Sequence, residues 1–117
     1  MFIFAHKRDG MVVEYEKEYL EELYENGRCK NKKYRFQKAV VSKYQKRIDT
    51  LMAATRIEDL FVFNSLNFEA LDNGYYSIRI DYHYRLEFKL RQEGTERVLT
   101  ISRLQILQTT INKIIWI

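Results

Sequence analysis

The chain has 117 residues, of which 46% are hydrophobic and 31% are charged, and its formal net charge is +4 at pH 7. This length allows one hydrophobic core but not two, and the composition is that of a globular domain rather than a disordered chain. The only cysteine, Cys29, excludes an internal disulfide and a cysteine-based zinc site, and no apolar run approaches the roughly 20 residues of a membrane span.

The N-terminal third predicts two short strands and an acidic helix. The strands cover residues 1–5 and 11–15. Residues 1–5 are apolar and precede the basic residues 6–8, the reverse of a signal peptide, so we expect a cytoplasmic protein. From Glu16 to Asn26 the apolar residues fall at helical spacing, and Asn26-Gly27 is a helix stop.

Charge then changes sign along the chain. Residues 14–25 hold six glutamates against one lysine, whereas residues 28–48 hold nine basic residues and no acidic one. A second helix is predicted from Arg35 to Ala53, with an apolar stripe that includes Val40, Tyr44 and Ile48. Two interpretations stay open: the basic helix faces the acidic one, or it forms a cationic groove for a phosphate backbone. The candidate nucleic-acid contacts in this region are Lys32, Lys33, Arg35, Lys43, Lys46 and Arg47.

The second half predicts a β-hairpin and a last strand. Residues 75–90 alternate apolar and polar side chains around a turn at Asp81-Tyr82-His83, and residues 97–107 continue the pattern. Arg79 and Arg85 are then neighbours on one sheet face, where two guanidiniums suit a phosphate. The alternative is a pair of solvated or salt-bridged arginines. The element order predicts a single α+β domain over residues 1–117, with an N-terminal helical hairpin packed on an antiparallel β-sheet.

Known catalytic motifs are absent from the sequence. It contains no P-loop, GxGxxG, HExxH or GxSxG, and two histidines with one distant cysteine make no convincing metal site, so we expect no metal or other cofactor. His83 is either a solvated turn residue or an acid–base group. Tyr82 and its neighbouring tyrosines, together with the arginines, suggest stacking on single-stranded RNA.

Several stretches carry a resemblance to a known family. They read Tyr19-Leu20-Glu21-Glu22-Leu23-Tyr24, Lys33-Tyr34-Arg35-Phe36-Gln37, Asn64-Ser65-Leu66-Asn67-Phe68-Glu69-Ala70-Leu71, Ser77-Ile78-Arg79-Ile80 and Tyr84-Arg85-Leu86-Glu87-Phe88. Over residues 11 to about 101 the chain resembles the RelE/HigB superfamily of toxin–antitoxin ribonuclease toxins, specifically the HigB-like plasmid-maintenance killer proteins. The resemblance implies a RelE/ParE-like fold and ribosome-dependent cleavage of mRNA by metal-independent attack of the 2′-hydroxyl. It also implies neutralisation by a HigA-like helix-turn-helix antitoxin.

The same resemblance suggests site residues. Arg79 and Arg85 match the motif arginines and would contact phosphate. Asn67 stands in the loop where many relatives carry an active-site His or Lys. With His83 these form the candidate catalytic set, and Tyr82 and Arg103 join the candidate RNA contacts.

Both ends depart from the family. Relatives that resemble this chain begin near Met11, so residues 1–10 are expected to be either an N-terminal extension or a misassigned start. Relatives end in Asn-His-Tyr-Lys, whereas residues 108–117 read Gln-Thr-Thr-Ile-Asn-Lys-Ile-Ile-Trp-Ile, without His or Tyr. Codons for Gln-Thr-Thr-Ile-Asn-Lys that are read one nucleotide earlier can encode Asn-His-Tyr-Lys and a stop, which suggests a frameshift between about Thr100 and Gln108. The resulting apolar tail is a candidate surface for association between copies.

Three functions therefore stay open. The first is a ribonuclease toxin, active or impaired by its altered tail. The second is a catalytically inactive relative that binds antitoxin or RNA, and the third is a ParE-like gyrase poison.

Overall fold

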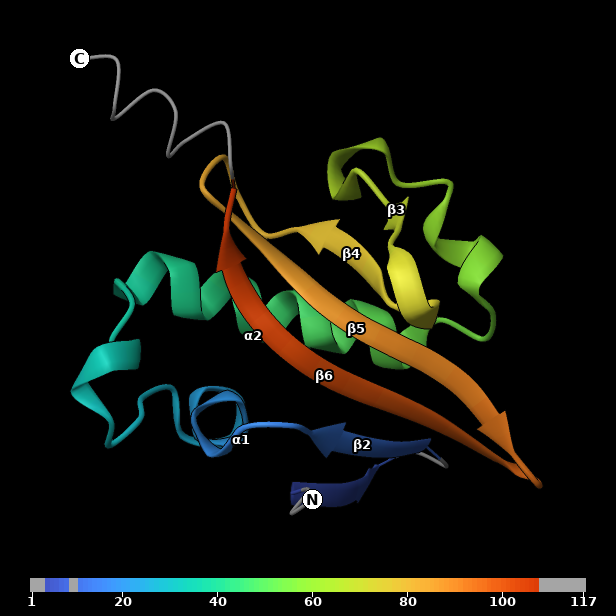
Figure 1. Ribbon diagram of the computed structural model, residues 1–117, viewed down its shortest axis with the longest axis horizontal. Coiled ribbons are helices and arrows are strands. Elements are labelled where there is room, and N and C mark those ends of the chain that lie inside the picture. The colour runs from blue at the N-terminus through green and yellow to red at the C-terminus, as the bar shows by residue number, and fades with distance from the viewer. Residues whose placement is uncertain (1–3, 9–10, 108–117) are drawn as a thin grey trace.

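A six-stranded sheet and two α-helices make up the protein, whose computed structural model describes residues 4–8 and 11–107 (Figure 1). The class is α+β, as the sequence predicts. The strands are β1 (Phe4–Arg8), β2 (Met11–Tyr15), β3 (Glu69–Ala70), β4 (Tyr76–Arg79), β5 (Tyr84–Glu93) and β6 (Glu96–Ile106). The helices are α1 (Glu18–Asn26) and α2 (Lys38–Ala53), and the short 3-10 turns are η1 (Lys32–Tyr34), η2 (Ile57–Leu60), η3 (Asn64–Leu66) and η4 (Asp72–Gly74).

The sheet is mixed, with the strand order β1-β2-β6-β5-β4-β3. Its neighbours are antiparallel except β2 and β6, which run parallel from Met11↔Arg97 to Tyr15↔Ile101. The predicted purely antiparallel sheet is therefore wrong at this pair. The chain leaves β2 through both helices and returns to its side only at β6, a long crossover of the kind that parallel strands need. The predicted N-terminal helical hairpin is also corrected, because β1 and β2 precede the helices.

The structure describes part of the predicted N-terminal extension but not the C-terminal tail. Residues 4–8 of the predicted extension form an edge strand, which pairs antiparallel with β2 from Phe4↔Tyr15 to Arg8↔Met11. Residues 1–3 and 9–10 lie outside the described part. The apolar tail and its predicted role in association fall on residues 108–117, which are also outside it.

The helices follow the predicted pattern, with a shifted start for the second. Gly27 ends α1 in a left-handed conformation (φ 74°), and its N–H donates to the Leu23 carbonyl. The start of α2 is Lys38 rather than Arg35, because the η1 turn and an extended Gln37 precede it. The Tyr44 hydroxyl donates to the Leu20 carbonyl at 2.7 Å, which joins the two helices inside the core.

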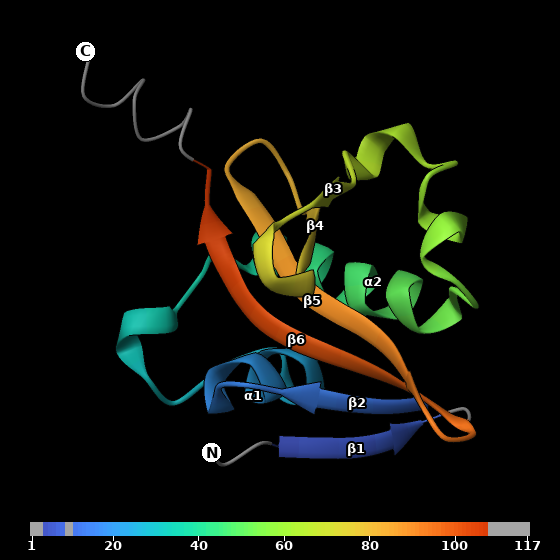
Figure 2. The same ribbon diagram turned by 45° about the vertical axis from the view of Figure 1, so that its right-hand side comes forward.

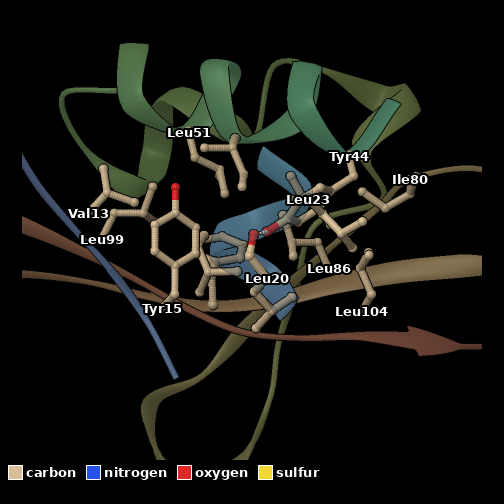
Figure 3. Packing of buried hydrophobic residues seen from close by; sticks show 14 of the residues in the cluster. Val13, Tyr15, Leu20, Leu23, Tyr44, Leu51, Ile80, Leu86, Leu99 and Leu104 are labelled. Carbon is tan, nitrogen blue, oxygen red and sulfur yellow. Dashed lines mark hydrogen bonds between the residues drawn. The ribbon is translucent and has the colours of Figure 1, made fainter. Parts of the chain in front are cut away.

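The core lies between the helices and one face of the sheet (Figure 3). On α2 the stripe Tyr44, Ile48 and Leu51 is fully buried, as the helical spacing predicts. In β5, Leu86 and Phe88 are also fully buried. Figures 1 and 2 show α2 crossing behind β5 and β6. The β5 residues that alternate with Leu86 and Phe88 therefore lie on the opposite face of the sheet.

Candidate nucleic-acid groove

A groove of about 1000 Å³ lies on the sheet face that points away from α2. Figures 1 and 2 show the η4 turn on this side of β5, whereas α2 lies on the far side. We call this hollow the central groove. Strands β5 and β6 form its floor, the β2–α1 junction with η1 forms one wall, and the β3–β4 connection forms the other. Its lining residues are Glu16, Lys17, Tyr19, Tyr34, Ala70, Leu71, Asp72, Asn73, Tyr75, Arg85, Glu87, Ser102, Arg103, Leu104, Gln105 and Ile106.

Two arginines share one carboxylate on the groove floor. Glu87 is only 4% exposed. Its Oε2 accepts from Arg85 Nε at 3.0 Å and lies 2.9 Å from Arg85 Nη2, and its Oε1 accepts from Arg103 Nε at 2.8 Å. The bond to Glu87 also raises the pKa of Arg103 above its usual range. Because a guanidinium carries five N–H donors, this arrangement fixes both side chains and leaves donors for a phosphate.

A β-bulge creates this geometry. Glu87 faces Arg103 across the β5–β6 pair, but the next residue, Phe88, faces Ile101, so Ser102 is the extra residue of β6. Strict alternation would send one of Ser102 and Arg103 toward the core. The bulge instead allows both to line the groove, where Ser102 bonds to Glu16 and Arg103 bonds to Glu87.

Three residues of the predicted catalytic set come together at the β4–β5 hairpin. Arg79 and Arg85 are direct partners in the antiparallel register, as predicted. Asn67 adopts a left-handed conformation (φ 45°) at the end of η3. With its amide oxygen turned toward Arg79, it accepts from Nε at 3.3 Å and from Nη1 at 3.1 Å. The salt-bridged alternative holds for Arg85, through Glu87.

Tyr82 and His83 lie at the tip of the same hairpin, outside the lining of the central groove. Asp81 accepts backbone N–H bonds from His83 at 2.8 Å and Tyr84 at 3.0 Å, and thereby shapes the predicted turn. His83 is exposed at its tip, and Tyr82 is 84% exposed. Neither lines the central groove, and of the predicted catalytic set only Arg85 does.

Of the predicted RNA contacts other than the tyrosine, only Arg103 lines the central groove. Arg103 lines the groove, and Lys32, Lys33 and Arg35 are exposed beside the lining residue Tyr34. The exposed Lys43 and Lys46 are on α2, which contributes nothing to the described groove lining. The half-buried Arg47 donates from Nε to the Arg79 carbonyl, which is a structural contact. The cationic groove predicted along residues 28–48 is therefore not the central groove, whose lining includes only Tyr34 from this stretch.

Sequence reasoning missed several groove residues. It did not single out Glu16, Glu87 or Ser102, because their positions depend on the β2–β6 pairing and on the bulge. It also missed the wall formed by Tyr19 and Tyr34, whose rings stack in parallel with centroids 3.8 Å apart. Only the chemistry of tyrosine, which suits stacking on bases, offered a signal.

Charge in the groove is balanced. Three cations (Lys17, Arg85 and Arg103) and three carboxylates (Glu16, Asp72 and Glu87) line it. A nucleic acid would therefore be held by placed donors and stacking surfaces more than by a net positive field. No group of three or more metal-binding side chains forms among residues 4–8 and 11–107.

Among solved structures the chain shows a distant likeness to a toxin. A solved structure described as a YoeB/ParE toxin from Agrobacterium tumefaciens is 18% identical, with a TM-score of 0.43, over 59% of this chain and 74% of that chain. No family model matches the chain. No curated protein matches it either. So distant a likeness carries no conclusion about function. In the part of the chain that the structure describes, no helix has the length and apolar character needed to cross a bilayer.

The buried Tyr19 makes the fold sensitive to alkaline pH. Burial raises its pKa from 10.0 to about 12. Between these values the unfolded chain releases the phenol proton while the native protein retains it, so stability falls as pH rises from about 10 to 12. We expect Tyr19 to account for about 2–3 kcal/mol of that loss. Denaturant titrations over this pH range should show a shallower decline for Tyr19→Phe than for the unchanged protein, and equal declines would contradict the assignment.

Proposed function

We propose that this chain is the toxin of a toxin–antitoxin module and cuts mRNA on the ribosome. The observation that carries the proposal is the pair Arg85 and Arg103, which Glu87 holds on the floor of a groove walled by tyrosines. Such a site suits a single RNA strand, with the guanidiniums on phosphate and the rings near bases. The motif resemblance described above supports the same function.

The reaction needs no metal in this proposal. The RNA 2′-hydroxyl attacks the adjacent phosphorus, the bond to the 5′-oxygen breaks, and the products are a 2′,3′-cyclic phosphate and a 5′-hydroxyl. Negative charge develops on the phosphate oxygens during attack, and preorganised guanidiniums stabilise that charge. Arg85 supplies this stabilisation at the groove floor, and Arg79, its partner on β4 outside the groove lining, adds positive charge beside it.

The partners follow from the proposal. The ribosome presents the mRNA, so the protein acts in the cytoplasm. A helix-turn-helix antitoxin neutralises it between episodes of activity.

A second candidate rests on the balanced charge of the groove. Three carboxylates offset its three cations, and the tail lacks the His and Tyr of similar chains. Both features favour a catalytically inactive relative that binds antitoxin or RNA. A gyrase poison of the ParE type has no feature of the groove in its favour.

Purified components separate these functions. The protein is added to ribosomes stalled on a defined mRNA and, in parallel, to gyrase with supercoiled DNA. Ribosome-dependent mRNA fragments with 5′-hydroxyl ends are expected, with intact DNA. Binding to ribosomes without fragments would favour the inactive relative, and gyrase-dependent DNA breaks would overturn the proposal.

A further inference from the structure

A hydrogen-bonded bridge crosses the central groove from wall to wall. Glu16, at the β2–α1 junction, accepts from Ser102 Oγ through Oε1 and from Tyr75 Oη through Oε2, both at 3.1 Å. Its own backbone N–H donates to the Ile101 carbonyl at 3.0 Å. Two hydroxyls therefore hold the carboxylate and a third bond holds the backbone of Glu16, which lines the same groove as the two arginines.

Tyr75 is fixed on the opposite wall, after η4. Its carbonyl accepts from Leu71 N–H at 2.8 Å, and Lys89 Nζ lies 4.3 Å from the centre of its ring. Burial raises the pKa of the Tyr75 phenol, Glu16 raises it further, and Arg103 partly opposes the rise. The phenol is consequently protonated at neutral pH and available as a proton donor.

The bulge of β6 places this bridge next to the phosphate-binding groups. Ser102 holds Glu16, and the following residue, Arg103, holds Glu87 and lies near enough to Tyr75 to affect it electrostatically. A phosphate bound by Arg103 would thus lie beside a carboxylate and a phenol. His83, the acid–base candidate from the sequence, lines no part of this groove.

We propose that Glu16 and Tyr75 are the proton-transfer pair of the groove, an inference that rests on the proposed function. Glu16 takes the proton of the attacking 2′-hydroxyl as the new O–P bond forms. Tyr75 gives its proton to the leaving 5′-oxygen as the old O–P bond breaks. The phenolate is a weaker base than a 5′-alkoxide, so this transfer is downhill.

The direct bond between the two side chains closes the cycle. After the reaction Glu16 carries a proton and Tyr75 lacks one. Because their oxygens are 3.1 Å apart, the proton passes from Glu16 to Tyr75 and restores both groups. The chain thereby has its own acid and base without a His or Tyr in its tail.

The test measures single-turnover cleavage of ribosome-bound mRNA by Glu16→Gln and Tyr75→Phe. Each variant is expected to cleave about 10²–10⁴-fold more slowly, the usual contribution of a general acid or base. Glu14→Gln is the matched control. Glu14 lies two residues earlier, accepts from Thr100 Oγ1 at 3.0 Å in the same manner, and is not part of the groove lining. Its cleavage should match that of the unchanged protein, and thermal melting checks that all variants fold.

A sulfur substitution in the RNA isolates the role of Tyr75. When the 5′-oxygen at the cut is replaced by sulfur, the leaving thiolate needs no proton. The Tyr75→Phe defect should then disappear, while the Glu16→Gln defect remains, an outcome that a purely structural role would not produce.

The outcomes separate the two proposals. Cleavage by both variants at the rate of the unchanged protein would overturn the inference and leave the ribonuclease function standing. A Tyr75→Phe defect that is equal on both substrates would remove Tyr75 as the acid. Absence of cleavage by the unchanged protein would overturn the proposed function and the inference together.

Discussion

Replacing Arg85 by alanine is expected to slow mRNA cleavage about 10²–10³-fold, the loss typical of removing one preorganised donor from a developing oxyanion. Arg85 is 29% exposed in its side chain and is oriented by Glu87 on the groove floor. Glu87 retains Arg103 as a partner in the variant, so the fold should survive. Single-turnover cleavage on ribosomes measures the effect.

Arg91→Ala provides the matched control. Arg91 lies on the same strand and donates to Glu93 at 2.8 Å and to Thr100 at 2.8 Å, but it is not a groove-lining residue. Its loss should leave cleavage within about twofold, because Arg91 does not line the groove, and its surface ion pairs contribute less than about 1 kcal/mol to stability, so the fold should survive. Equal losses for the two variants would mean that the groove does not bind the reacting phosphate.

The largest effect on stability is expected for Phe88→Ala. Phe88 is fully buried, and its ring centre lies 5.9 Å from that of Tyr76. Removing a buried phenyl ring leaves a cavity and costs about 3–5 kcal/mol. Since a domain of this size is stable by only about 5–15 kcal/mol, the variant should lose a large part of its free energy of unfolding. Urea denaturation measures the change.

Phe63→Ala tests whether burial is the cause. Phe63 is 52% exposed after η2, so the same chemical change should cost less than about 1 kcal/mol. A similar loss for both variants would contradict the assignment of the core to the layer between α2 and the sheet.

The sequence predicted those parts of the fold that depend on local patterns. Helical spacing and Asn26-Gly27 predicted α1, and alternation around Asp81 predicted the β4–β5 hairpin with Arg79 beside Arg85. Local patterns contain no information on which distant strands become neighbours. The parallel contact of β2 with β6 was therefore missed.

The candidate site was predicted only in part, because it also depends on which distant strands become neighbours. Arg85 and Arg103 were expected contacts, but their common partner Glu87 looked like an ordinary polar residue of an alternating strand. The place of Ser102 required the bulge, and the place of Glu16 required β2 to lie beside β6. The basic residues of α2 were grouped by sequence proximity, although the helix presents its exposed side away from the sheet.

The most direct test of the central claim, that the groove carries the reaction with its present residues, is a map of mRNA 5′ ends in bacterial cells. One strain would express this chain, and a second would express a version in which residues from Gln108 onward are replaced by Asn-His-Tyr-Lys. We predict new 5′ ends within translated messages in both strains soon after induction. New ends only with the replaced tail, or in neither strain, would contradict the claim that the central groove is sufficient for cleavage.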